Sequence, residues 1–323
     1  MTFKARGLYA SSSKEPGRFR RGPWMLLGGV LVVGLVVFTA FSVLGNMTVN
    51  HSDRTDSFSG VAEIELENST GGRVELRGGD GDEVVVEREL SGSPVSEPDE
   101  DIEAEGGQLE IDTDCSGLLF FSGCSVNYDI TVPAGTRVTV ETVSGRITAS
   151  NIEGELTTHT TSGSVQVANQ VGAVDVETVS GAIELDGVEG SVTAESTSGQ
   201  ITATGSGDLL DLSTTSGRID ASGFEADEVR SESVSGTQKL GGGFTALEAS
   251  SVSGEIEVRT DAPFDLMSVE TVSGGVRATV PDESYDITGE SVSGERDFDV
   301  DTASDSDSRI DVSTVSGGVR ISN

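Results

Sequence analysis

Apolar and polar residues alternate along most of the chain beyond residue 60, in short segments separated by glycine-containing turns. In "VDVETVSGAIELDGVEG", residues 174–190, Val174 and Val176 fall on one side of an extended strand, and Ile183 and Leu185 fall on one side of the next. A period of two is typical of β-strands that bury one face. The pattern therefore predicts an all-β fold.

A Ser-Gly pair recurs between these strands at a nearly constant interval. Its glycines are spaced by 18, 18, 18, 18, 19, 18, 20, 20 and 23 residues, at Gly145, Gly163, Gly181, Gly199, Gly217, Gly236, Gly254, Gly274, Gly294 and Gly317. The repeat predicts a single-stranded β-solenoid of ~18-residue rungs, with the Ser-Gly pair at one corner of each rung. Glycine suits a corner because it adopts positive φ, or because it leaves room for a close backbone approach.

Two further positions keep their character when the repeats are aligned on this glycine. Two residues after it, every copy is Ile or Val except Gln238 and Arg296. Three residues before it, every copy is Ser or Thr. Since rungs stack about 4.8 Å apart, the first position predicts an inward-facing apolar column. The small hydroxyls can bond backbone groups at the corner.

The position four residues before the glycine is acidic in most copies. It holds Glu141, Glu177, Glu195, Glu232, Glu270 and Glu290, interrupted by His159, Ser213, Ser250 and Ser313. This position should face solvent, and a solvated acidic stripe is one interpretation. The other is that neighbouring pairs, Glu177 with Glu195 and Glu270 with Glu290, bind Ca²⁺ through carboxylate oxygens. We expect no other metal or cofactor.

The regular repeats are expected over residues 133–323. Residues 61–132 contain shorter, degenerate strand–turn–strand units, and they predict an N-terminal β cap with irregular rungs. Within this cap, the acidic segment 91–107 is expected to be an exposed loop. Residues 46–60 are expected to form a linker.

An uncharged apolar segment, residues 24–45, precedes this linker. As a helix it would span about 33 Å, which matches a bilayer core. The preceding residues 1–23 hold six basic residues and one acid, which places them in the cytoplasm. A cleaved signal peptide is the alternative, but the apolar segment is too long for one and no cleavage site follows it. We therefore predict a single-pass cell-membrane protein with an extracytoplasmic solenoid.

The formal net charge is −35, and because the basic tail is positive, the rest of the chain, with 14 basic and 54 acidic residues, is more acidic still. So acidic a surface repels nucleic acid, which excludes nucleic-acid binding. The charge also serves solubility, including solubility at high salt.

The chain has two cysteines, Cys115 and Cys124, on either side of "SGLLFFSG". Outside the cytoplasm they are expected to form a disulfide that closes a short loop. The apolar residues of this loop either tuck under it as a plug or project toward a partner or membrane.

The sequence offers little catalytic chemistry. His51 precedes the solenoid, His159 occupies an outward-facing rung position, and Lys239 is the one lysine beyond the basic tail. No Ser/His/Asp arrangement is evident, so we predict no enzymatic activity and no catalytic residue. A polysaccharide-active β-helix enzyme is the less favoured alternative.

The segment "YDITVPAGTRVTVETVSGRI", followed by recurrent Ser-Gly turns, resembles the putative-adhesin family of unknown function found in envelope and envelope-stress proteins. The resemblance covers roughly residues 60–323 and implies a right-handed β-solenoid without attributed catalytic residues. It favours a binding or structural role, either envelope sensing through a membrane protein of the same cell or adhesion to a surface polymer. A cation-dependent surface structure is the alternative, and self-association is left open.

Overall fold

The computed structural model describes residues 31–36, 39, 50–93, 96–117 and 124–323. The chain divides into two units, residues 1–48 and 49–323. In the first unit, residues 31–36 are helical. Most of the predicted transmembrane segment 24–45 lies outside the described residues, and none of the described helical residues belong to a helix long and apolar enough to cross a membrane. The second unit is an all-β solenoid of about ten turns.

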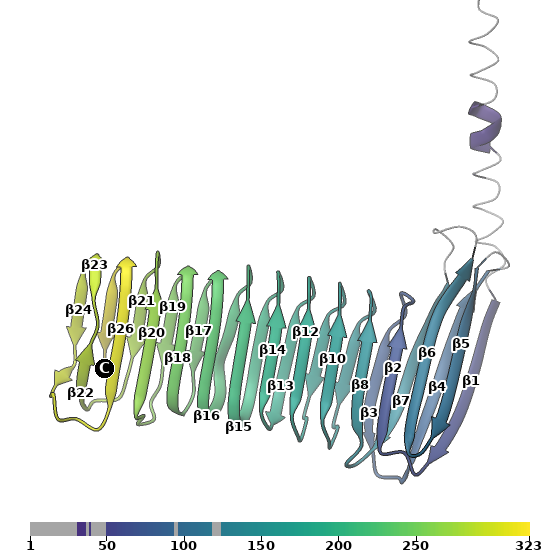
Figure 1. Ribbon diagram of the computed structural model, residues 1–323, viewed down its shortest axis with the longest axis horizontal. Coiled ribbons are helices and arrows are strands. Elements are labelled where there is room, and N and C mark those ends of the chain that lie inside the picture. The colour runs from purple at the N-terminus through teal and green to yellow at the C-terminus, as the bar shows by residue number, and fades with distance from the viewer. Residues whose placement is uncertain (1–30, 37–38, 40–49, 94–95, 118–123) are drawn as a thin grey trace, which may run out of the picture. The chain divides into compact units, whose positions relative to one another are not determined.

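The rungs of the solenoid are flattened, so that their strands form two facing parallel sheets (Figure 1). The first sheet holds the strands that lead into the Ser-Gly corner: β8 (Arg137–Thr142), β10 (Leu156–Thr160), β12 (Val174–Thr178), β14 (Val192–Ser196), β18 (Phe244–Ser253), β20 (Leu266–Thr271) and β26 (Arg309–Ser316). The second sheet holds the strands that leave it: β9 (Ile147–Ser150), β11 (Val165–Ala168), β13 (Ile183–Glu189), β17 (Gln238–Gly241), β19 (Ile256–Arg259), β21 (Val276–Thr279) and β27 (Val319–Ser322). Strands β15 (Ile201–Thr214) and β16 (Ile219–Ser235) continue from the second sheet into the first sheet of the next rung.

The core is the column of inward-facing side chains between the two sheets. Rungs pair in register, with Val165 opposite Ile147 and Ile183. The predicted apolar position two residues after the glycine is buried, at 0–2% exposure, from Ile147 through Val319. Gln238 is also fully buried in this column, and its Nε2 donates to the Ser250 carbonyl at 2.6 Å.

The Ser-Gly corner needs glycine because neighbouring rungs touch there through their backbones. A Cβ at Gly181 would lie 1.6 Å from the Gly163 carbonyl oxygen, and one at Gly199 would lie 1.7 Å from the Gly181 oxygen. None of the ten corner glycines has positive φ. The sequence left two explanations for glycine at this corner, positive φ and a close backbone approach. The structure supports the close backbone approach.

The buried Ser or Thr three residues before the glycine ties the corner together. The Gly181 N–H donates to Thr178 Oγ1 at 3.0 Å, and the Gly199 N–H donates to Ser196 Oγ at 2.7 Å. These hydroxyls satisfy backbone donors that would otherwise be orphaned in a dry corner.

The last two rungs are not stacked in sequence order. The C-terminal rung, β26 and β27, lies between the rung of β20 and β21 and an outer rung formed by β22 (Ser284–Thr288), β23 (Ser291–Ser293), β24 (Arg296–Asp299) and β25 (Asp301–Thr302). Accordingly, the carbonyl of Gly274 faces Gly317, and the carbonyl of Gly317 faces Gly294.

Arg296 explains this order. In sequence order, its side chain would occupy the apolar column between Val276 and Val319. In the observed order Val276 pairs directly with Val319, and Arg296 lies on the outermost rung, where it is exposed. Burying an unpaired guanidinium would cost several kcal/mol, so the observed order is favoured over the sequence order. We call this reversal of the last two rungs the rung exchange.

The N-terminal end is also out of sequence order. Strands β2 (Glu63–Asn68) and β3 (Val74–Gly79) lie between the rung of β8 and β9 and an outer rung of β6 (Gln108–Gly117) and β7 (Ser125–Pro133). Antiparallel strands then close the end: β4 (Glu83–Gly92) on β7, β1 (Asn50–Ser59) on β4, and β5 (Ser96–Glu105) on β6. Two expectations differ from this. Much of the segment 46–60 is the paired strand β1 rather than a linker, and much of the segment 91–107 is the hairpin strand β5 rather than a loop.

Inward-facing charges line the interior of this cap. Arg88 is 5% exposed, and its Nη1 lies 3.4 Å from Glu100 Oε1, while Asp56 also pairs with Arg88. The Tyr128 hydroxyl donates to Glu100 at 2.8 Å and is hydrogen-bonded to Thr113. Burial raises the pKa of Tyr128 well above its usual range. Inward charges keep an open sheet edge from pairing with another chain.

Candidate binding face

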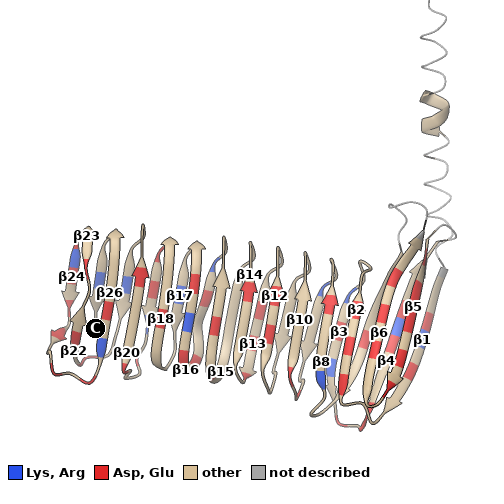
Figure 2. Cartoon of the chain, in the orientation of Figure 1, with Lys and Arg blue, Asp and Glu red and all other residues tan. Residues whose placement is uncertain are grey.

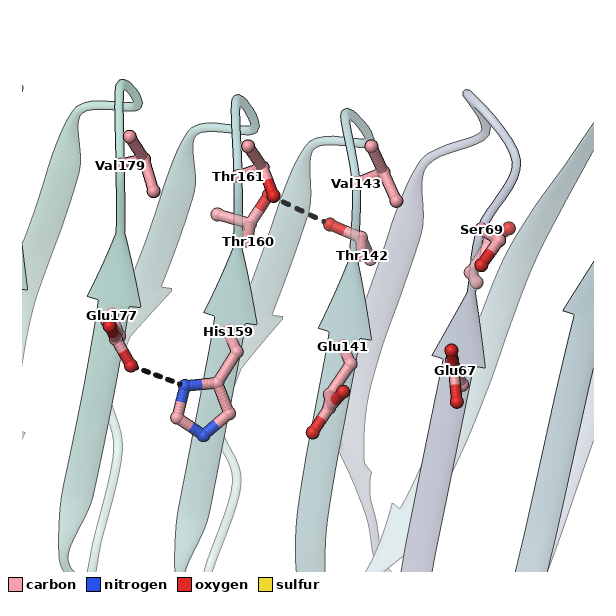
Figure 3. A pocket seen from close by; sticks show the side chains of 11 residues that line it. Glu67, Ser69, Glu141, Thr142, Val143, His159, Thr160, Thr161, Glu177 and Val179 are labelled. Carbon is pink, nitrogen blue, oxygen red and sulfur yellow. Dashed lines mark hydrogen bonds and ion pairs between the residues drawn. The ribbon is translucent and has the colours of Figure 1, made fainter.

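A shallow groove runs along the first sheet just below the Ser-Gly corners (Figure 3). It encloses about 500 Å³ and crosses β2, β8, β10 and β12. Its lining residues are Glu67, Asn68, Ser69, Glu141, Thr142, Val143, His159, Thr160, Thr161, Glu177 and Val179. We call the outer surface of the first sheet, which carries this groove along its corner edge, the binding face.

The floor of the groove is held by the buried corner hydroxyls. Thr142 Oγ1 donates to Thr160 Oγ1 at 3.0 Å (Figure 3), and Thr160 Oγ1 in turn accepts the Gly163 N–H at 3.0 Å. Because strand residues alternate, the residues on either side of each hydroxyl point outward. Those outward residues form two columns along the face, one acidic and one apolar.

The acidic column begins beyond the regular repeats. In register, Asp112 pairs with Glu67 and Glu67 with Glu141 on adjacent strands. Burial raises the pKa of Glu67 above its ordinary value, and the carboxylates of Asp112 and Glu141 add to that shift. Glu67 therefore holds its proton more tightly in the folded protein than in the unfolded chain.

His159 interrupts the acidic column inside the groove. It lies between Glu141 and Glu177, and its Nδ1 is 3.2 Å from Glu177 Oε2. The prediction that this side chain faces outward holds. A histidine at this point relieves the repulsion that a third stacked glutamate would add.

The rung exchange changes the carboxylate neighbours near the C-terminal end. Glu177 and Glu195 are adjacent, as predicted. Glu270 and Glu290 are not, because Ser313 of the inserted rung lies between them. The predicted Glu270/Glu290 cation pair is therefore wrong. Across the described part of the chain, no three His, Cys, Asp or Glu side chains cluster in a way that could hold a metal ion.

The apolar column lies two residues before each corner glycine and was not anticipated from the sequence. Its members in spatial order are Val143, Thr161, Val179, Thr197, Thr215, Val234, Val252, Val272, Val315 and Val292. The valines among them are 46–74% exposed. The signal was present, because this position is always Val or Thr and lies two residues from the acidic position that was expected to face solvent, on the same side of the strand.

The other candidate residues are scattered. His51 is on the edge strand β1, and Lys239 is on the second sheet, where its Nζ lies 3.6 Å from Glu257 Oε2. Neither lies near His159. Figure 2 shows acidic positions along the whole stack, with far fewer basic ones.

The cysteines lie at the end of the cap. Cys115 and Cys124 are joined by a disulfide between β6 and the start of β7, with their Cα atoms 6.1 Å apart. The residues "LLFF" between them lie in 118–123, outside the described residues.

These features define an acidic, repetitive β-solenoid with one outer face organised in columns. The Toastrack DUF4097 family model matches residues 61–189, 125–208 and 192–322, and the chain belongs to this family of unknown function. No curated protein matches the chain.

Several solved structures are similar to the chain. A putative adhesin from Parabacteroides merdae is 14% identical, with a TM-score of 0.48, over 85% of this chain and 97% of its own. A putative lipid binding protein from Parabacteroides distasonis is 16% identical, with a TM-score of 0.44, over 85% and 97%. A putative cell adhesion protein from Clostridium sporogenes is 10% identical, with a TM-score of 0.28, over 84% and 99%. At these values the similarity says nothing about ligand or activity.

Proposed function

We propose that the protein is a membrane-anchored binding module, held by residues 24–45 with its N-terminus in the cytoplasm and its solenoid outside. Its role is non-catalytic, in cell-envelope sensing or in adhesion. The observation that carries the binding role is the binding face, on which outward side chains recur at every rung as continuous columns. A rigid ladder of this kind can present the same contact many times to a long partner.

The location rests on independent features of the chain. The apolar segment 24–45 and the basic tail before it fit a signal anchor. The Cys115–Cys124 disulfide fits an oxidising compartment outside the cytoplasm.

Photo-crosslinking in intact cells tests the binding role. A photoreactive residue at Glu195 or Val252 on the binding face should capture a partner. The same residue at Gln166, on the second sheet, serves as the matched control and should capture much less. Capture of a membrane protein of the same cell favours sensing, and capture of wall polymer or of a neighbouring cell favours adhesion. Equal capture from both sheets, or none, would contradict a dedicated binding face.

A further inference from the structure

Five valines stand side by side at the C-terminal end of the apolar column. They are Val234, Val252, Val272, Val315 and Val292, and each is 46–74% exposed. The five form a strip about 19 Å long, four rung spacings of about 4.8 Å. The rung exchange leaves the strip unbroken and sets the order of its last two members, with Val315 between Val272 and Val292.

A column in which glutamate alternates with serine runs beside these valines. In spatial order it reads Glu195, Ser213, Glu232, Ser250, Glu270, Ser313 and Glu290. Carboxylates therefore recur at every second rung, about 9.6 Å apart. In sequence order two glutamates would have been adjacent at the end, so the exchange also produces this regular alternation.

We propose that the five valines and the neighbouring glutamates form a docking track for a basic amphipathic α-helix of a partner protein. The proposal deepens the proposed function, on which it rests, by naming the partner class and the part of the face that binds it. The valines would contact the apolar side of the helix, and Glu232, Glu270 and Glu290 would pair with its lysine or arginine residues.

The spacing of the track favours a helix. Apolar residues recur along a helix once per turn, about every 5.4 Å, close to the rung spacing of about 4.8 Å. Basic residues at every second turn recur about every 11 Å, close to the carboxylate spacing. An extended strand presents same-side residues about every 6.7 Å and loses register within two rungs.

Charge on the binding face selects a cationic partner. Arginines on this sheet are themselves paired: Arg230 lies 2.5 Å from Glu228 and Arg309 lies 3.0 Å from Asp286. Within the part of the chain that the structure describes, Glu232, Glu270 and Glu290 form no salt bridge. A second copy of this chain is a poor occupant, because the two glutamate columns would face each other.

The first test is direct binding of a helical probe. The probe is a synthetic peptide of about 18 residues, with leucine once per turn and lysine beside it. Calorimetric titration into the full-length chain in phosphatidylcholine nanodiscs, with empty nanodiscs as blank, should show binding that weakens with salt. A peptide of the same composition with alternating leucine and lysine should bind at least about tenfold more weakly. Equal binding of both peptides would overturn the proposal in favour of unspecific polyanion attraction.

Variants of the track locate the site. Threonine occupies the same column position at Thr161, Thr197 and Thr215, so the quadruple variant V234T/V252T/V272T/V315T should fold. It should bind the probe at least about tenfold more weakly, because the apolar contacts are lost. The matched control V143T/V179T, at the other end of the column, should bind like the unchanged chain. Unchanged affinity in the quadruple variant would overturn the proposal.

The two proposals fail separately. If Val252 captures a glycan in cells while the helical probe does not bind, the docking track is wrong and the binding module stands. If neither sheet captures anything, the binding module itself is wrong.

Discussion

Glycine at the Ser-Gly corner is fixed by the distance between rungs and not by its own backbone angles. At Gly181 a Cβ would overlap the carbonyl oxygen and carbon of Gly163, which are backbone atoms that cannot move aside without shifting the rung. The serine before it is exposed and has no such constraint. Glycine is therefore required at this corner because the rungs stack closely there.

We expect Gly181→Ala to destabilise the solenoid by about 3 kcal/mol, because two rungs must separate to admit the methyl group. Chemical denaturation followed by circular dichroism measures the change. The neighbouring Ser180→Ala is the control and should stay within about 0.5 kcal/mol. A Gly181→Ala variant as stable as this control would show that the rungs do not touch at the corner.

Glu67 gives a pH-dependent expectation. Its pKa is raised in the folded protein, mainly by burial and then by Asp112 and Glu141. A raised carboxyl pKa means that the folded state binds the proton more tightly, so stability falls as the pH rises from the ordinary value of 4.5 through the folded-state value.

Glu67→Gln should accordingly raise the melting temperature at pH 7, with a gain that vanishes as the pH falls below about 4. Because Glu67 is only partly desolvated and its side chain is largely exposed, the gain should not exceed about 0.5 kcal/mol. Thermal melts across this pH range measure it, with Glu248→Gln on the same sheet as control. A gain that is the same at pH 4 and pH 7 would exclude the charge explanation.

At the scale of the elements, the sequence predicts the strands of each rung but not the position of that rung in the stack. Alternation and the constant Ser-Gly spacing predict each strand pair, because both follow from local geometry. The order of the rungs at the two ends depends on which rung can be the outermost one, with one side left unpaired and exposed to solvent. Arg296 was recognisable as an exception in the apolar column, but only the structure turns that exception into an outermost rung.

The same limit explains the binding face. His159 and the glutamate stripe were predicted to face outward, and they do. The Glu270/Glu290 pairing failed because it assumed sequence order. The cap charges, Arg88 with Glu100, could not be anticipated, since two strands of different hairpins bring them together only in the folded cap.

Engineered disulfides test the rung order. Cysteines at Val272 and Val315 occupy matching positions in adjacent rungs and should form a disulfide, because neighbouring rungs place their Cα atoms within about 5 Å. Cysteines at Val272 and Val292, two rungs apart, should not. Gel mobility without reductant distinguishes the two variants. A disulfide in the second pair and not in the first would mean that the rungs stack in sequence order.

On the scale of the whole molecule, the solenoid has protected ends and one organised face. At one end Arg88 and Glu100 point inward, and at the other Arg296 lies on the outermost rung. Charges at both open edges discourage end-to-end stacking. The remaining surface for a long partner is the outer face of the sheets.

The proposed role requires the solenoid to stand outside the cell, and site-specific thiol labelling measures this directly. A cysteine is placed at Ser216, an exposed corner residue, or at Ser11 in the basic tail, and intact cells are treated with a membrane-impermeant maleimide. The unchanged chain controls for Cys115 and Cys124. We expect Ser216→Cys to react in intact cells and Ser11→Cys to react only after permeabilisation. Labelling of Ser11→Cys alone, or of neither until the cells are opened, would contradict a solenoid displayed outside the cytoplasm.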